Sequence, residues 1–468
     1  MANVLSMLFS TQYMVRNELK RGDMIPSREA YNSLLTIALP AIVEMVSISV
    51  IGMADTAMVG RLGPYAVAAV GLTNQPRMLF MSVFLALNVA VTAIVSRRKG
   101  QGEQESARQC LKQAIMAELG LVVLLSALQV VSAEWVMKLA GANEDTLSAS
   151  VDYFVIMGFG LIFPAMSTTI CAAQRGVGRT KITMTVNLAA NVVNVIFNYL
   201  LIGGNFGFPR LGVAGAAIAT VIGNGVGLVL AIMSLRHKHE YLHIPLKGSW
   251  KLDILMIKNI FSVTSGAMIE QLASRIGFFW FAAVVAGLGT NDFAAHQICM
   301  QLMNLSFTFA DGVAAATTAM VGQNMGKNRP DLSIMFGKVG QRVAFIISIV
   351  LCISVISTRF LFASMFTQDQ AIIALTADVL LILAFILPIQ TSQIVMGGSL
   401  RGAGDTRFVA LTMLATVTLI RPVLSSVLIG VFHFGLVGAW YAIVFDQIVR
   451  LTLLFTRFSR GKWIDIRV

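Results

Sequence analysis

One stretch of this chain occurs twice, and this duplication limits the folds that the sequence can adopt. The segment from Thr92 to Gly100 begins Thr-Ala-Ile-Val, and 226 positions later the segment from Thr318 to Gly326 begins Thr-Ala-Met-Val. Further pairs at the same offset are Glu44 and Glu270, Leu62-Gly63 and Leu288-Gly289, and Arg175-Gly176-Val177-Gly178 and Arg401-Gly402-Ala403-Gly404. Because the register is kept through helices and loops alike, we interpret the chain as one structural unit encoded twice.

The composition places both copies in a membrane. Hydrophobic residues make up 56% of the 468 residues and charged residues only 12%, whereas soluble domains carry about a quarter charged residues. Apolar stretches of about 20 residues, long enough to cross roughly 30 Å of hydrocarbon, recur along the chain. We predict an all-α membrane protein with twelve transmembrane helices in two homologous six-helix lobes. The predicted spans are 34–60, 66–96, 113–137, 148–174, 182–203, 211–235, 257–287, 293–321, 339–363, 374–398, 407–432 and 434–457.

These spans divide the chain into five parts. We expect a cytoplasmic N-terminal segment at 1–33, an N-lobe at 34–235, a cytoplasmic linker at 236–256, a C-lobe at 257–457 and a cytoplasmic tail at 458–468. Internal duplication is common in transporters, which bind substrate and coupling ions between their repeats. Prolines inside the predicted spans are expected to mark bends, and they are Pro40, Pro76, Pro164, Pro388 and Pro422.

The net charge of +12 fits a membrane orientation better than nucleic-acid binding. Basic residues would bind phosphate if they gathered in one patch, but here most of them fall in alternate loops and in the two terminal segments. The opposite loops hold only Arg61, Lys138, Arg210 and Arg359. By the positive-inside rule, we predict a multi-pass protein of the cell membrane with both termini in the cytoplasm and no nucleic-acid partner. We expect a monomer in the lipid bilayer.

The first lobe carries polar residues that a membrane helix rarely holds. An ionisable residue deep in a span costs about 2.5–3.5 kcal/mol on insertion scales, yet the first predicted span contains Glu44 and Asp55. In the fifth span, spacings of four, three and four put four amides on one helix face, at Asn187, Asn191, Asn194 and Asn198. This stripe fits two uses, contact between helices or a hydrated site for Na⁺ or a proton that Asp55 completes.

The second lobe lacks the asparagine stripe and carries different polar residues. Glu270, Arg275, Asp311 and Gln390, together with Glu44 of the first lobe, are candidates for substrate contact or for a second polar cluster. Glu270 and Arg275 are five residues apart and can pair across adjacent turns. Asp446 and Arg450, four residues apart in the last span, are expected to form a local ion pair.

Several motifs resemble those of the multidrug and toxic compound extrusion (MATE) transporters. The first is Asp55-Thr56-Ala57-Met58-Val59-Gly60-Arg61-Leu62-Gly63 with Ala68-Ala69-Val70-Gly71. Others are Gln174-Arg175-Gly176-Val177-Gly178-Arg179-Thr180, Asn194 to Asn198 before Tyr199-Leu200-Leu201-Ile202, Gly215-Ala216-Ala217-Ile218-Ala219-Thr220, and Leu400-Arg401-Gly402-Ala403-Gly404-Asp405-Thr406. They occur in the family's order, and the resemblance covers residues 34–457.

The resemblance implies two six-helix lobes around a central cavity and the export of amphipathic, often cationic compounds in exchange for Na⁺ or H⁺. It implies no catalytic residue and no cofactor other than the coupling ion. The family's coupling positions correspond to Asp55, Asn194, Asn198 and Thr220, with Na⁺ as one possible ligand of Asp55, Asn194 and Asn198. Some branches have a second carboxylate where Asn198 stands, and the sodium-coupled bacterial branch has a tenth-span acid where this chain has Gln390 near Gln393.

Two other functions fit parts of the sequence. A lipid-linked oligosaccharide flippase has a similar architecture and needs cavity cations for a pyrophosphate, for which Arg77, Arg275 and Arg421 are candidates. A membrane zinc protease is more remote. His239-Glu240-Tyr241-Leu242-His243 matches the HExxH motif, but that motif requires a helix and here lies in the linker just before Pro245. We therefore expect a transporter and not an enzyme.

Overall fold

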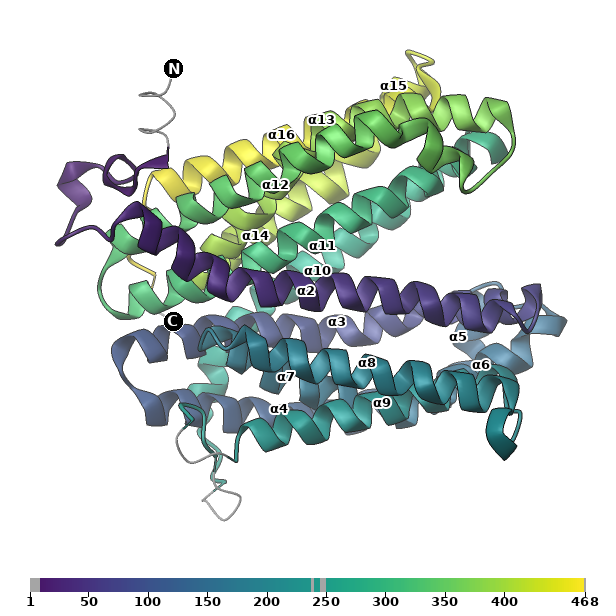
Figure 1. Cartoon of the computed structure of the whole chain (residues 1–468), viewed down its shortest axis with the longest axis horizontal. Coiled ribbons are helices and arrows are strands. Elements are labelled where there is room, and N and C mark those ends of the chain that lie inside the picture. The colour runs from purple at the N-terminus through teal and green to yellow at the C-terminus, as the bar shows by residue number, and fades with distance from the viewer. Residues whose placement is uncertain (1–8, 237–239, 245–249, 467–468) are drawn as a thin grey trace. The chain divides into compact units, whose positions relative to one another are not determined.

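The computed structural model describes residues 9–236, 240–244 and 250–466, and almost all of them are helical (Figure 1). No β-strand occurs in these residues. Within the same ranges, ten helices are long and apolar enough to span a membrane, and a bent pair of shorter helices raises the number to eleven. One further long helix, α11 (Thr290–Gly326), carries the polar residues Asp292, His296 and Asp311 and is not among those candidates. With α11, the helices are consistent with twelve spans.

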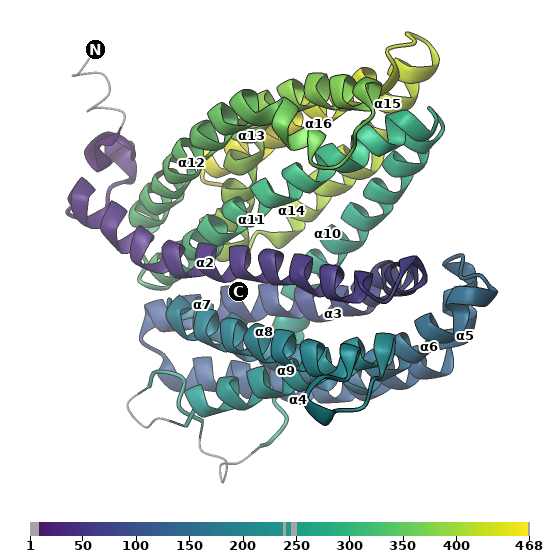
Figure 2. The same cartoon turned by 45° about the vertical axis from the view of Figure 1, so that its right-hand side comes forward.

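The helices of the first repeat follow one another with short connections. They are α2 (Ser27–Gly60), α3 (Pro64–Gln101), α4 (Gln104–Val131), the short α5 (Ala133–Leu139), α6 (Glu144–Phe159), α7 (Ile162–Gly176), α8 (Thr180–Gly203) and α9 (Gly212–Ser234). In both views α8 lies beside α9, with which it packs closely (Figures 1 and 2).

The helices of the second repeat also follow one another along the chain. They are α10 (Ile254–Ala286), α11, α12 (Pro330–Ser364), α13 (Gln370–Ala403), α14 (Thr406–Met413), α15 (Arg421–Gly430) and α16 (Gly435–Ser459). A π-helical segment, Leu414–Ile420, joins α14 to α15, and Pro422 stands in the first turn of α15. The predicted bend at Pro422 therefore coincides with a change of helix type.

Two predicted spans are interrupted. The predicted span 113–137 is divided between α4 and α5 at Ser132, whose hydroxyl donates to the Leu128 carbonyl oxygen at 2.6 Å. The predicted span 148–174 consists of α6 and α7, which meet at an angle of 50°. Pro164 explains this bend, because its ring clashes with the carbonyl four residues earlier, at Gly160, and it cannot donate a backbone hydrogen bond.

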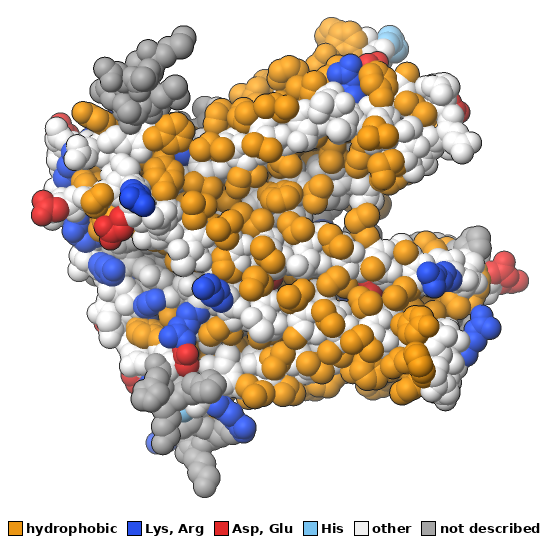
Figure 3. Space-filling model, viewed as in Figure 1, with side chains coloured by type: hydrophobic (Ala, Val, Ile, Leu, Met, Phe, Trp, Pro, Cys, Tyr) orange, Lys and Arg blue, Asp and Glu red, His pale blue; other side chains and the backbone are white. Residues whose placement is uncertain are grey.

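Packing divides the chain into two compact units. One consists of Val43–Thr264, and the other of Met1–Ile42 with Ser265–Val468. On the face drawn in Figure 3, hydrophobic side chains cover the lengths of the helices, and Lys and Arg gather toward helix ends. This distribution suits helices that cross a bilayer. The lobe limits at 34–235 and 257–457 rest on the predicted spans and stay a prediction.

The sequence repeat is also a repeat of contacts. In the first copy the Thr92 hydroxyl donates to the Ala172 carbonyl oxygen at 3.0 Å, which joins α3 to α7. In the second copy Thr318 donates to the Gly398 carbonyl oxygen at 2.8 Å, which joins α11 to α13. Both pairs of partners are related by the 226-residue offset, so the duplicated sequence builds the same helix joint twice.

Each joint depends on a glycine at the closest approach of the two helices. A Cβ atom on Gly176 would lie 2.8 Å from the Thr92 carbonyl oxygen, and one on Gly402 would lie 2.3 Å from the Thr318 carbonyl oxygen. Both distances are shorter than a van der Waals contact, so a larger residue would push the helices apart. These glycines belong to the duplicated Arg-Gly-X-Gly motif.

Gly402→Ala is expected to destabilise the protein by about 1–3 kcal/mol, the usual cost of overpacking a close contact. Thermal unfolding in detergent measures the effect. Gly120→Ala is the matched control, because Gly120 lies within α4 and an added Cβ there would meet nothing within 4 Å. Equal melting temperatures for Gly402→Ala and the control would contradict this account of the joint.

Candidate functional site

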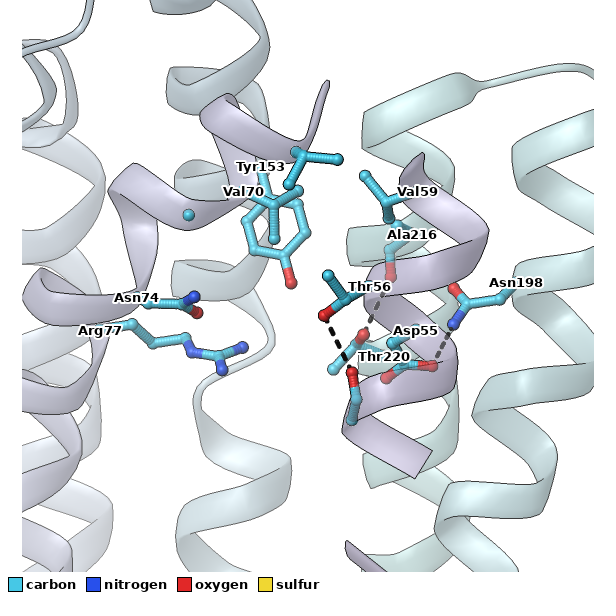
Figure 4. A pocket seen from close by; sticks show the side chains of 13 residues that line it. Asp55, Thr56, Val59, Val70, Asn74, Arg77, Tyr153, Asn198, Ala216 and Thr220 are labelled. Carbon is cyan, nitrogen blue, oxygen red and sulfur yellow. Dashed lines mark hydrogen bonds between the residues drawn. The ribbon is translucent and has the colours of Figure 1, made fainter. Parts of the chain in front are cut away.

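A polar pocket of about 350 Å³ lies within the unit formed by Val43–Thr264 (Figure 4). Helices α2, α3, α6, α8 and α9 all contribute side chains to it. Its polar lining residues include Asp55, Asn74, Arg77, Tyr153, Asn198 and Thr220. The pocket therefore joins one carboxylate and one guanidinium with neutral amides and hydroxyls.

Asp55 on α2 is held by amides of α8. The Asn198 Nδ2 donates to Asp55 Oδ1 at 2.7 Å (Figure 4). When the Asn194 amide is oriented with its nitrogen toward the carboxylate, that nitrogen donates to Asp55 Oδ1 at 2.8 Å and the amide oxygen lies 3.0 Å from Thr220 Oγ1. Asp55, Asn194, Asn198 and Thr220, the four residues named by the family resemblance, thus lie together. Their role in ion coupling stays a prediction.

The helices reach this arrangement because α9 approaches α8 closely. A Cβ atom on Gly223 of α9 would lie 2.6 Å from the Ala190 carbonyl oxygen and 2.9 Å from the Asn194 Cβ. Only glycine leaves room for this contact. Since Asn194 and Asn198 are four residues apart, both amides lie on the buried face of α8.

The asparagine stripe serves two carboxylates. Asn187 Nδ2 donates to Glu44 Oε1 at 2.7 Å, and eleven residues later Asn198 donates to Asp55, which is eleven residues after Glu44. The equal spacing shows that α2 and α8 run in the same direction over this length. Asn187 and Asn198 each connect the two helices. Of these two residues, Asn198 lines the pocket and Asn187 does not.

Glu44 has a complete set of partners. Besides Asn187, it accepts from Thr183 Oγ1 at 2.5 Å and pairs with Arg175 at 3.1 Å. In the second repeat Glu270 pairs with Arg401 at 2.7 Å, a partner that its spacing of five from Arg275 did not suggest. The sequence already indicated that Arg401 is equivalent to Arg175, because the two arginines are separated by the same offset of 226 residues as the two glutamates.

The other candidates of the second polar cluster lie in the unit that contains Ser265–Val468. Asp311 is near enough to Arg401 and Glu270 for their charges to act on it. Gln390 is fully buried, and neither of its side-chain polar atoms has a hydrogen-bond partner among the described residues. Glu44 belongs to the other unit, so the five candidates do not form a single cluster within either unit.

The predicted ion pair of Asp446 and Arg450 is present, with 2.7 Å between Arg450 Nη2 and Asp446 Oδ1. Sequence reasoning missed its third member, Arg421, which also binds Asp446 and lies over the Phe278 ring. The contributions of Asn74 and Tyr153 to the pocket were missed as well. Asn74 and Arg77, three residues apart in an apolar helix, were a usable signal, whereas Tyr153 gave none.

The HExxH motif does not form a zinc site in the part that the structure describes. His239 lies outside the described residues, and residues 240–244 form a turn and not a helix. Glu240 pairs with Arg179, and His243 Nδ1 lies 3.1 Å from the Leu235 carbonyl oxygen. Within the described ranges, no group of three His, Cys, Asp or Glu side chains is placed to hold a metal.

The pocket offers a cation several oxygen ligands. The carboxylate of Asp55 and the side-chain oxygens of Asn198 and Thr220 are hard donors, which suit Na⁺ as well as a proton on the carboxylate. Asn198 Oδ1 is buried and has no hydrogen-bond partner among the described residues. An unpartnered buried oxygen beside a carboxylate fits a site for a small cation.

Long apolar helices around a polar pocket are typical of multi-pass membrane transporters. The model of the MatE family matches residues 40–200 and again residues 267–427, once in each repeat. Because these matches cover most of the chain, the protein belongs to the MatE family. It is a transporter and not an enzyme.

Relatives match over most of their length. The probable multidrug resistance protein NorM of Thermotoga maritima is 28% identical over 446 residues, which are 93% of each chain. The multidrug resistance protein PmpM of Pseudomonas aeruginosa is 29% identical over 85% of this chain and 83% of its own. An outward-facing multidrug resistance MATE family transporter superposes with a TM-score of 0.86 at 20% identity, over 95% of this chain and 98% of that one.

Gly223→Ala is expected to push α9 away from Ala190 and Asn194, which lowers the melting temperature and loosens the Asn194–Thr220 contact. Gly225→Ala is the matched control, two residues along the same helix, where the nearest atom to an added Cβ is at 3.9 Å. Thermal unfolding in detergent compares the two variants. A Gly223→Ala protein as stable as Gly225→Ala would contradict the close approach of α8 and α9.

Proposed function

We propose that the protein is a secondary active multidrug efflux transporter, which exports amphipathic, often cationic compounds in exchange for Na⁺ or H⁺. The names of the relatives NorM and PmpM support multidrug resistance as the function. The single observation that carries the ion exchange is Asp55, a carboxylate in a pocket whose hydrogen-bond partners are neutral side chains.

Asp55 differs in its partners from three other buried carboxylates of the helices. Glu44 and Glu270 each pair with an arginine, and Asp446 pairs with two. Asp55 is bound by asparagine amides, which do not neutralise its charge. A carboxylate in such surroundings gains stability from a bound cation or a proton.

Glu118 is the nearest comparison, because it also accepts a hydrogen bond from a neutral group, the hydroxyl of Thr169 at 2.9 Å. Glu118 is 0% exposed and is not among the residues that line the pocket. An ion or substrate that enters the pocket therefore reaches Asp55 and not Glu118. Access, as much as charge, supports Asp55 as the proposed coupling residue.

The transport cycle follows from competition for one negative charge. A cation bound by Asp55, Asn194, Asn198 and Thr220 changes the contacts of α2 with α8 and α9. It therefore stabilises either the inward-facing or the outward-facing state more than the other. A ligand shifts such an equilibrium only by its difference in affinity for the two states. Ion binding in the state that faces outside thus releases a cationic substrate there, and the ion gradient drives the cycle.

The orientation in the membrane and the oligomeric state belong to the same proposal. The concentration of Lys and Arg in alternate loops supports cytoplasmic N- and C-termini in the cell membrane. We propose that the transport unit is a monomer.

A lipid-linked oligosaccharide flippase is less well supported, because Arg421, one of its three candidate cations, is buried against Asp446.

Asp55→Asn is expected to suppress gradient-driven efflux and to weaken binding of a cationic substrate, because ion and substrate both lose the negative charge for which they compete. The decrease in initial rate should be roughly tenfold or more, since coupling free energies of 1–3 kcal/mol correspond to factors of about 5–150. Efflux of a fluorescent lipophilic cation from proteoliposomes, with a Na⁺ gradient and a pH gradient imposed separately, measures it.

Asp152→Asn is the control for this experiment, because Asp152 is an exposed carboxylate on α6 that lines a different pocket. It should leave efflux unchanged. Full efflux by Asp55→Asn under both gradients would overturn the coupling role of Asp55.

A further inference from the structure

Helices α2 and α10 each belong to both packing units. The boundary between the units falls within α2 at Ile42 and Val43, and within α10 at Thr264 and Ser265. These two helices begin the two repeats. Any relative movement of the units must therefore be accommodated within α2 and α10.

Each of these helices carries a buried glutamate soon after it enters its second unit. Glu44 is 2% exposed and Glu270 is 6% exposed. Glu44 pairs with Arg175 inside one unit, and Glu270 pairs with Arg401 inside the other. The two partners are 131 residues apart in both pairs, so the ion pairs are copies of each other.

Both arginines stand at the rigid joints described above. Arg175 precedes Gly176, which packs on Thr92, and Arg401 precedes Gly402, which packs on Thr318. Two residues after each of these glycines, Gly178 and Gly404 take the left-handed conformation, with φ of 83° and 95°. The turns that follow the two arginines therefore have the same backbone conformation at this position. The guanidinium groups are thus fixed to α7 and α13 by close backbone contacts.

We infer that the ion pairs Glu44–Arg175 and Glu270–Arg401 are two equivalent anchors. Each anchor makes the C-terminal part of its helix, α2 or α10, move with the unit that contains the arginine. Breaking a buried ion pair leaves an uncompensated charge, so neither helix separates readily from its arginine. The anchor of α2 lies eleven residues before Asp55 on the same helix. It therefore makes Asp55 move together with Asn194, Asn198 and Thr220.

This inference rests on the proposed alternating access for its consequence in transport, but its test does not need transport. Spin labels at Gln101 and Lys327, exposed residues with one in each unit, report the distribution of distances between the units. Cys352, the partly exposed one of the four cysteines, is replaced by serine so that labelling is specific.

Glu44→Gln and Glu270→Gln should each change the population of at least one distance by about fivefold or more, the lower end of the range for coupled sites. The double variant Glu270→Arg with Arg401→Glu should restore the original distribution. Asp405→Asn is the control, because it removes an ion pair of similar length, with Arg457 at 2.8 Å, that involves neither α2 nor α10. It should lower the melting temperature and leave the distances unchanged.

The outcomes separate this inference from the proposed function. If the distances between the spin labels in the wild type respond to Na⁺ or pH but both glutamine variants keep the wild-type distribution, the two ion pairs do not act as anchors. An altered distribution in Asp405→Asn equal to that in Glu44→Gln would also overturn them, because the effect would then be general destabilisation. If the wild-type distances ignore Na⁺ and pH while the two glutamine variants differ from it, the anchors stand and ion coupling fails.

Discussion

The structure depends on the cost of placing a charged side chain inside a membrane protein. Glu44, Glu270 and Asp446 each meet this cost with arginine partners from other turns or other helices. Asp55 is stabilised by amides and lies in a pocket that a cation can enter. The same physical constraint therefore assigns two roles to similar residues. Carboxylates that pair with arginine hold helices together, and Asp55, which is bound by amides and lines a pocket, suits a cation.

Much of the fold was predictable because it depends on local pattern. Apolar length predicts the spans, and the breaks at Ser132 and Gly160 fall inside predicted helices because apolar length does not register a local interruption. The offset of 226 residues predicts equivalent joints, and Thr92 and Thr318 form them. The spacing of Asn194 and Asn198 predicts one polar face, and both amides lie beside Asp55.

The rest depends on contacts between residues far apart in the chain. The spacing of Glu270 and Arg275 suggested a local pair, but Arg401 is the partner, 131 residues away. Such a choice is made by the packing of α10 against other helices, which periodicity does not describe. Tyr153 enters the pocket for the same reason, since nothing local distinguishes it from an aromatic residue that faces lipid. The aligned repeats were the one sequence signal that reached over this distance.

The central claim is that a coupling cation and a cationic substrate compete at Asp55. Binding of tetraphenylphosphonium to the purified protein tests it most directly, with proton release followed by a pH dye in Na⁺-free buffer and the apparent Kd measured with and without Na⁺. The account predicts that the wild type releases protons on binding or binds more weakly in Na⁺, and that Asp55→Asn does neither. Equal proton release and an equal Na⁺ effect in Asp55→Asn would contradict it.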